Sequence, residues 1–286
     1  MGDAGEDREA RMSKRSTGQT TRREALFLGA SAAFAVAKGS ARAAEAKSES
    51  PDPKVKTPQW SLAIDLDRCL RCQACVVACA AENNIAPAGP QLSQTMRPIH
   101  WMEVLDPQAR GRLWELGPWP APVPCMHCER PECVKVCPVG ACHRADDGIV
   151  VQVWDRCIGC RACMVACPYG RRSYNWTAPA WPGGDASAVN PDVAIRPVGV
   201  VEKCTLCQHR IRAVTERARL DEEPVQDEKI LRLPACAAAC PSRAITFGDG
   251  SDPESAVSKL ARSARAVYLL AHLETHPRVF YLRGKR

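Results

Sequence analysis

Cysteines at short, repeated intervals are the residues in this sequence best suited to chemistry. The segment DRCLRCQACVVACA begins at Asp67, and a near copy, DRCIGCRACMVACP, begins at Asp155. Each copy spaces its cysteines as C-x2-C-x2-C-x3-C. A [4Fe–4S] cubane needs four thiolates, and three cysteines at this spacing wrap one cubane while the fourth points elsewhere. The repeated spacing therefore predicts iron–sulfur clusters.

The cysteines of the whole chain follow the same pattern, because all but one of the 17 fall into four groups of four. Group two has a longer second gap, and group four is split by a long intervening stretch. Pro follows the last cysteine of groups two, three and four, where it ends the turn, and Ala80 takes that place in group one. The groups are Cys69, Cys72, Cys75 and Cys79 (group one); Cys125, Cys128, Cys133 and Cys137 (group two); Cys157, Cys160, Cys163 and Cys167 (group three); and Cys204, Cys207, Cys236 and Cys240 (group four).

Two other uses of cysteine compete with this interpretation. A C-x2-C pair often belongs to a zinc site, and group four alone fits a zinc ribbon. Zinc sites take their ligands as two separated pairs, however, which groups one and three do not offer. Disulfides are the other alternative for an exported chain. Cys142 lies outside the groups and is predicted to be a small buried residue.

The first 43 residues have the layout of an export signal. A basic stretch ends in Arg22-Arg23, an apolar run follows, and Ala41-Arg42-Ala43 fits an A-x-A cleavage site. The paired arginines resemble a twin-arginine signal, although Ala25 stands where Phe is common. That pathway exports proteins already folded with their cofactors, which favours metal over disulfides. We therefore expect a periplasmic protein without a transmembrane helix of its own, since no later segment reaches about 18 apolar residues.

Composition argues against several other functions. The formal net charge is +7, but no basic run is interleaved with aromatic residues, so nucleic acid is not an expected partner. No Gly-rich nucleotide motif stands out, and we find no separate catalytic constellation. His127 and His209 lie close to cysteine groups and are predicted to form hydrogen bonds rather than ligate metal. Arg171 and Arg172 are predicted to be solvated or to face a partner.

Regular elements must position the cysteines. Alternating apolar and polar residues predict a strand before each repeated cysteine loop, and a short helix follows each loop. The predicted strands are 61–67, 148–155 and 244–249, and the predicted helices are 74–83, 162–170, 211–222 and 254–274. The stretches 80–124 and 176–200 are rich in Pro and Gly and are predicted to be surface insertions that cover clusters and meet partners.

From about Trp60 to the C-terminus, the sequence resembles the four-cluster ferredoxin-type electron-transfer subunits of membrane-associated oxidoreductases. The resemblance rests on the grouped cysteines and on the segments ACPYGRRSYNW, VEKCTLCQHRI and THPRVFYL. This family includes the iron–sulfur subunits of molybdopterin reductases and the periplasmic subunit of the sulfite-reduction-associated complex. It implies an α+β fold of two bacterial-ferredoxin-like 2×[4Fe–4S] modules with loop insertions and little regular sheet.

The resemblance also implies which cysteines share a cluster. Groups one and four form module A, groups two and three form module B, and within each module the fourth cysteines are exchanged. The implied ligand sets are Cys69, Cys72, Cys75 and Cys240 (set one); Cys79, Cys204, Cys207 and Cys236 (set two); Cys125, Cys128, Cys133 and Cys167 (set three); and Cys137, Cys157, Cys160 and Cys163 (set four). Arg71 in the first copy replaces Gly159 of the second; it either places a cation beside a cluster or is solvated.

The implied function is electron transfer. A periplasmic subunit of this kind relays electrons through four [4Fe–4S] clusters. One partner is an integral-membrane quinone-interacting subunit, and the other is a catalytic molybdopterin, cytochrome or other redox subunit. Together they form a respiratory oxidoreductase that acts on sulfur or related compounds. The alternatives are a self-contained iron–sulfur redox enzyme and a zinc-stapled binding module. The expected organisation is a signal peptide at 1–43, a flexible linker at 44–59, the first part of module A with an insertion at 60–124, module B at 125–175, an insertion and the second part of module A at 176–253, and a C-terminal helix and tail at 254–286.

Overall fold

The computed structural model describes residues 57–87, 98–106, 116, 118, 120–181, 189–222, 225 and 227–284. The chain divides into two units, Met1–Asp52 and Pro53–Arg286, and every described residue belongs to the second. The predicted signal peptide and nearly all of the predicted linker therefore lie outside the described residues. None of the helices in the described ranges is both long enough and apolar enough to span a bilayer.

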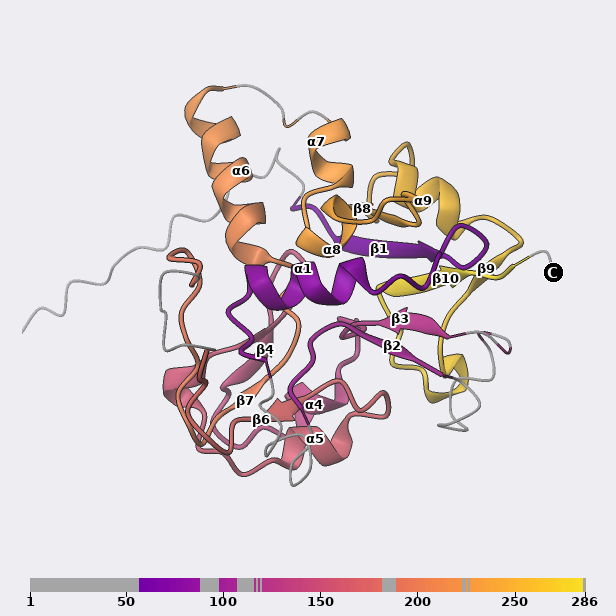
Figure 1. Cartoon of the computed structure of the whole chain (residues 1–286). Coiled ribbons are helices and arrows are strands. Elements are labelled where there is room, and N and C mark those ends of the chain that lie inside the picture. The colour runs from indigo at the N-terminus through magenta and orange to yellow at the C-terminus, as the bar shows by residue number, and fades with distance from the viewer. Residues whose placement is uncertain are drawn as a thin grey trace, which may run out of the picture. The chain divides into compact units, whose positions relative to one another are not determined.

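Short helices and short strands alternate along the chain, so the fold is α+β, as predicted (Figure 1). The strands are β1 (Trp60–Asp65), β2 (Glu103–Leu105), β3 (Ala121–Val123), β4 (Cys142–Arg144), β5 (Val150–Gln152), β6 (Ser173–Tyr174), β7 (Val201–Glu202), β8 (Ile245–Asp249), β9 (Ala266–Val267) and β10 (Val279–Leu282). The helices are α1 (Ala74–Glu82), α4 (Glu132–Lys135), α5 (Ala162–Ala166), α6 (Gln208–Leu220), α7 (Asp227–Leu231), α8 (Ala235–Ala238) and α9 (Ala256–Ala261).

Strand β1 is the centre of the main sheet, whose order is β8-β1-β10-β9. It pairs in parallel with β10 and antiparallel with β8. Alternate side chains of a strand point to opposite faces. Leu62 and Ile64 accordingly join the large core cluster, whereas Ala63 packs with Phe280 and Val257 of α9 in a second, smaller cluster. Trp60 stacks on Phe247 of β8 with ring centroids 5.1 Å apart.

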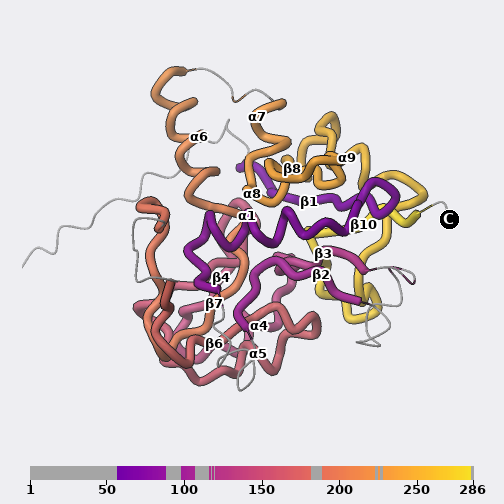
Figure 2. Tube along the Cα trace, viewed as in Figure 1, coloured from indigo at the N-terminus to yellow at the C-terminus, as the bar shows by residue number. Residues whose placement is uncertain are grey.

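Two sets of pairings bring distant cysteine groups together. Strand β1 precedes group one and β8 follows group four; they pair antiparallel, and helix α1 packs against α8. Strand β4 follows group two and β5 precedes group three; they also pair antiparallel, and α4 packs against α5. Figure 2 shows α1 beside α8, and α4 beside α5, despite their separation along the chain. Groups one and four are therefore neighbours, as are groups two and three.

Most of the predicted elements are confirmed. Strands overlap 61–67, 148–155 and 244–249, and helices occur at 74–82, 162–166 and 208–220. The prediction of a helix over 254–274 is wrong beyond Ala261. Residues Ala266 and Val267 instead pair with Leu282 and Tyr281 as β9, so sheet pairing overrides a weak helix propensity.

Two other predictions need correction. The end of the chain is not a tail, because β10 lies between β1 and β9 and is buried throughout. The stretch 80–124 is not simply a surface insertion either. Its strands β2 and β3 pair antiparallel, and Trp101, Met102 and Leu105 are buried in the large core cluster. These segments carry apolar side chains that the fold needs to bury around its cysteines.

Candidate iron–sulfur cluster sites

The two repeated loops share an uncommon backbone conformation. Arg71 and Gln73 in the first copy, and Gly159 and Arg161 in the second, all have φ between 59° and 69°. Positive φ is rare for residues other than Gly. In both copies the helix begins immediately after the second of these residues. This geometry leaves the second cysteine of each loop, Cys72 or Cys160, exposed and buries the third.

Set one is gathered around a small cavity lined by all four of its cysteines. The pKa of the Cys75 thiol is raised to about 11 by burial and by the neighbouring thiols of Cys69, Cys240 and Cys72. The backbone N–H of Ala244 donates to Cys240 Sγ at 3.2 Å. Burial raises the pKa of Cys69, and the backbone N–H and the charge of Arg71 oppose that rise. Arg71 thus lies near a set-one thiol and is also exposed to solvent, so both alternatives given for it describe its position.

Set two is the most deeply buried. Burial raises the pKa of the Cys79 thiol, and so do the thiols of Cys204, Cys207 and Cys236. Hydrogen-bond donors surround the sulfurs: the backbone N–H of Leu206 lies 3.3 Å from Cys204 Sγ, and that of Ala235 lies 3.4 Å from Cys207 Sγ. Donors of this kind stabilise thiolates in iron–sulfur sites.

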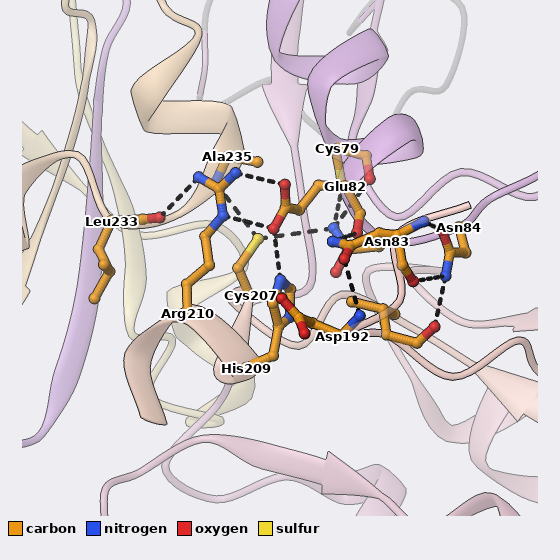
Figure 3. A network of polar contacts seen from close by, with 12 residues as sticks. Cys79, Glu82, Asn83, Asn84, Asp192, Cys207, His209, Arg210, Leu233 and Ala235 are labelled. Atoms are coloured by element: carbon orange, nitrogen blue, oxygen red, sulfur yellow. Dashed lines mark hydrogen bonds and ion pairs between the residues drawn. The ribbon is translucent and has the colours of Figure 1, made fainter. Parts of the chain in front are cut away.

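Asn83 joins two sulfurs of set two, as Figure 3 shows. Its Nδ2 lies 3.7 Å from Cys79 Sγ and 3.7 Å from Cys207 Sγ, and it donates to the Cys79 carbonyl at 2.9 Å. Next to it, the Glu82 carboxylate accepts hydrogen bonds from Arg210 and contacts His209 Nε2 at 2.6 Å. These contacts lower the pKa of Glu82, although its burial acts in the opposite direction. His209 therefore pairs with a carboxylate, as a hydrogen-bonding role predicts.

Set three combines the start of group two with the end of group three. The pKa of the Cys128 thiol is raised to about 12 by burial and by the thiols of Cys125, Cys133 and Cys167. His127, between two of these cysteines, is fully buried, and its Nδ1 accepts a hydrogen bond from the Val150 N–H at 3.1 Å. Burial holds the pKa of His127 well below its usual value. Because Nδ1 accepts a hydrogen bond from a backbone N–H, it carries no proton and the imidazole is neutral.

Set four is brought together only in part by the described contacts. Burial raises the pKa of the Cys163 thiol, and the thiols of Cys157 and Cys160 contribute. The Val201 N–H lies 3.5 Å from Cys157 Sγ. Cys137 Sγ instead accepts from the backbone N–H of Cys142 at 3.4 Å, and no contact between described residues joins it to the other three thiols.

Cys142 is buried, as predicted, but it also contacts cysteines of the ligand sets. Its Sγ lies 3.9 Å from Cys133 Sγ, and Nη2 of Arg172 lies 2.8 Å from Cys142 Sγ. The prediction that Arg171 and Arg172 are solvated or face a partner is wrong, because both are buried. Arg171 pairs with Glu103 at 2.6 Å. Sequence reasoning missed the positions of Arg172, Asn83 and Lys203, and only their closeness to cysteine groups hinted at a role.

Thiols of different sets also influence one another's pKa. The thiol of Cys75 in set one acts on Cys79 in set two and contributes to its raised pKa. After burial, the thiol of Cys125 in set three is the strongest influence raising the pKa of Cys204 in set two, to about 12. In set four, the thiol of Cys133 in set three contributes to the raised pKa of Cys163. These influences link set one with set two, set two with set three, and set three with set four.

The donors present fit [4Fe–4S] clusters. Among the residues that the structure describes, no three His, Cys, Asp or Glu side chains are placed to hold a single metal ion. A cubane makes no such demand, because each of its four thiolates binds a different iron. The sets offer thiols with backbone N–H donors around them, and when bound, the clusters would supply one-electron redox chemistry.

Comparison with known families and proteins agrees with this chemistry. A family described as "4Fe-4S dicluster domain" matches residues 119–182, and a "4Fe-4S binding domain" matches residues 66–82. The menaquinone reductase iron–sulfur cluster-binding subunit of Nitratidesulfovibrio vulgaris is 45% identical, over 78% of this chain and 88% of its own length. The Hdr-like menaquinol oxidoreductase iron–sulfur subunit 1 of Archaeoglobus fulgidus is 38% identical, over 91% and 97%. A sulfite dehydrogenase subunit of Allochromatium vinosum is 36% identical, over 78% and 82%.

Each of these relatives matches more than three quarters of the chain, and the Archaeoglobus fulgidus subunit covers so much of it that all four cysteine groups are included. The chain belongs to the family of iron–sulfur electron-transfer subunits of quinone-linked and molybdopterin oxidoreductases.

Proposed function

We propose that this protein is a periplasmic electron-transfer subunit that relays electrons through four [4Fe–4S] clusters, one in each of sets one to four. The observation that carries the proposal is the meeting of thiols from separate cysteine groups: Cys240 with group one, Cys79 with group four, and Cys167 with group two. Exchange of the fourth cysteine between paired groups is the ligation pattern of two-cluster ferredoxins.

The strand and helix pairings support two ferredoxin-like modules. In module A, β1 pairs with β8 and α1 packs against α8; in module B, β5 pairs with β4 and α5 packs against α4. The dicluster family match at 119–182 spans both cysteine groups of module B. Each module thus repeats one arrangement, with two cysteine groups facing each other.

The surface around each repeated loop supports two separate docking ends. Cys72 in set one and Cys160 in set four are the exposed cysteines of the described residues. Each has two exposed apolar neighbours at equivalent positions of the copies: Leu70 and Val77 (65% and 68% exposed) in the first, and Ile158 and Val165 (64% and 89%) in the second. An exposed cysteine with exposed apolar side chains on the same loop and helix suits contact with a second redox protein.

The kind of partner is inferred from the names of the relatives. These include menaquinone and menaquinol oxidoreductases and sulfur-compound enzymes, namely sulfite dehydrogenase and tetrathionate reductase. We infer that one end meets an integral-membrane quinone-interacting subunit. The other end meets a molybdopterin, cytochrome or other redox subunit of a complex that acts on sulfur or related compounds.

Anaerobic purification tests the proposal. The protein should carry about sixteen iron atoms and as many sulfides, four for each cubane. Dithionite reduction should give interacting paramagnetic signals from [4Fe–4S] clusters. A fresh preparation with about twelve iron atoms or a strong [3Fe–4S] signal would contradict the four complete ligand sets. Zinc without visible absorption would contradict electron transfer itself.

A further inference from the structure

Two of the buried cations in the described part of the chain have no carboxylate partner. Arg171 pairs with Glu103 and Arg196 with Glu202, at 2.6 and 2.7 Å. Lys203 and Arg172 are as deeply buried, with 1% and 5% of their surface exposed. The described residues offer neither of them a carboxylate within ion-pair distance. A buried charge without a counter-charge strongly destabilises the folded protein, so an anion is expected nearby.

Lys203 lies at the boundary between the two modules. Its ammonium donates to the carbonyl of Cys204, at 2.7 Å, and to the carbonyl of Val150 in β5 of module B. Both acceptors are neutral. The charge of Lys203 lowers the pKa of Cys204 in set two. It also lowers the pKa of Cys133 in set three, although the hydrogen bond that Cys133 accepts from Cys142 has the larger effect there. This lysine therefore faces sets two and three at once.

Arg172 approaches set three from the side of module B. Its Nη1 donates to Gln152 Oε1 at 2.9 Å, and its Nη2 lies 2.8 Å from Cys142 Sγ. Cys142 Sγ in turn lies 3.9 Å from Cys133 Sγ. Burial alone would lower the pKa of Arg172, but the thiols of Cys133 and Cys142 raise it. Its partners are thus sulfur and amide groups, not carboxylates.

Both cations lie beside set three. Lys203 bonds the carbonyl of Val150, whose N–H donates to His127 between Cys125 and Cys128. Arg172 contacts Cys142, which lies against Cys133, and both charges lower the pKa of Cys133. Set two shares Lys203, which bonds the Cys204 carbonyl, but its other described cation, Arg210, is neutralised by Glu82 at its Nη2 and Nε atoms. Set four shares Arg172, whose charge opposes the raised pKa of Cys163. Arg71, near set one, is exposed to solvent. An oxidised cubane with four thiolates carries about −2 and gains another negative charge on reduction. Cations fixed beside it favour the reduced form.

We propose that Lys203 and Arg172 are the buried counter-charges of set three and that they hold its cluster at the highest reduction potential of the four. The inference rests on the proposed function, because it requires a [4Fe–4S] cluster in each set. The set-three cluster is then the first of the four clusters to be reduced. It is the neighbour of set four, which contains the exposed Cys160.

The test is a potentiometric titration of the anaerobic full-length protein, followed by paramagnetic resonance. The variants are Lys203→Gln and Arg172→Gln, which remove the charge but keep a hydrogen-bond donor. Lys135→Gln is the matched control: Lys135 is in α4, two residues from Cys133, but it is exposed and pairs with Glu132 at 2.6 Å. Cys128→Ser identifies the set-three signal, because that signal should be lost or altered in it.

We expect the highest midpoint potential to fall in Lys203→Gln and in Arg172→Gln, and to stay unchanged in Lys135→Gln. The proposal is overturned if the highest midpoint potential stays unchanged in both charge variants, or if it falls by the same amount in Lys135→Gln. It is also overturned if the signal altered by Cys128→Ser is not the one with the highest midpoint potential. If a charge variant loses iron, the charge-conserving variants Lys203→Arg and Arg172→Lys distinguish charge from packing. Iron retained in these variants supports a role for the charge. Iron lost from them as well assigns the residues to packing and overturns the proposal. Wild-type protein without four reducible clusters would instead refute the proposed function.

Discussion

Cys142 Sγ lies 3.9 Å from Cys133 Sγ, although Cys142 belongs to none of the four cysteine groups. The pKa of the Cys133 thiol is lowered because Cys142 donates a hydrogen bond to it. The backbone N–H of Cys142 also donates to Cys137 Sγ. Cys142 therefore donates hydrogen bonds to a thiol of set three and to a thiol of set four.

This contact predicts opposite outcomes for two neighbouring cysteines. Cys142→Ser keeps both donors, so it should retain all four clusters at a cost of about 1 kcal/mol in stability for placing a hydroxyl in a buried site. Cys137→Ser removes a ligand and should damage the cluster held by Cys157, Cys160 and Cys163. Iron counting and paramagnetic resonance on both variants test this. A cluster lost from Cys142→Ser but kept in Cys137→Ser would refute the ligand assignment of set four.

Asn83 should tune set two. Asn83→Ala removes a buried donor to two sulfurs, so stability should fall by about 1–3 kcal/mol, and the set-two midpoint potential should fall with it. Asn84→Ala is the matched control, because Asn84 is equally buried but donates to the carbonyls of Asn190 and Val193. The control should lose similar stability and leave all potentials unchanged. Equal shifts of potential in both variants would rule out a specific role for Asn83.

A close backbone contact explains why the second copy has Gly159 where the first copy has Arg71. A Cβ on Gly159 would lie 2.2 Å from the Gly199 carbonyl oxygen. Gly159→Ala should therefore displace the loop that presents Cys157 and Cys160, and it should lose iron. Gly170 has a similar φ of +62°, but a Cβ there would meet open space. Gly170→Ala should therefore lower the free energy of unfolding only by the backbone strain, about 1–2 kcal/mol. Thermal unfolding and iron analysis compare the two, and equal losses would show that the contact with Gly199 is unimportant.

The exposed apolar residues should matter for docking and not for the clusters. Val165→Lys should weaken binding of one redox partner about tenfold, which corresponds to about 1.4 kcal/mol, while the spectrum of the isolated protein stays the same. Leu220→Lys, at the C-terminal end of α6, is the control, because Leu220 is also an exposed apolar residue. Binding to the reconstituted complex measures both. An effect of Leu220→Lys as large as that of Val165→Lys would contradict a docking end around Cys160.

The twin-arginine signal expected in residues 1–43 predicts a change of location without a change of cofactor. Arg22→Lys combined with Arg23→Lys should leave the protein in the cytoplasm, still with its clusters, because the twin-arginine route carries folded proteins. Cell fractionation followed by iron analysis measures this. Normal export of the double variant would show that residues 1–43 act through another route.

Local features of this protein could be predicted from its sequence because they depend on short-range patterns. The cysteine spacing predicted the chemistry, and the alternation before Cys69 and Cys157 predicted β1 and β5. The helix after each loop follows from the same repeat. These elements are specified by residues within one or two turns of each other, so a single sequence is enough to find them.

Long-range features were decided only by the tertiary structure. The helix predicted over 254–274 ends at Ala261 because β10 offers the following residues a strand to pair with. Arg172 and Lys203 look like ordinary surface cations in the sequence. The pairing of β4 with β5 and the packing between modules nevertheless bury Arg172 beside Cys142 and Lys203 beside Cys204. Cysteine spacing alone thus determined that this protein binds iron–sulfur clusters. Which thiols meet, and which charges are buried beside them, depends on contacts between residues tens of positions apart, whose energies no local pattern encodes.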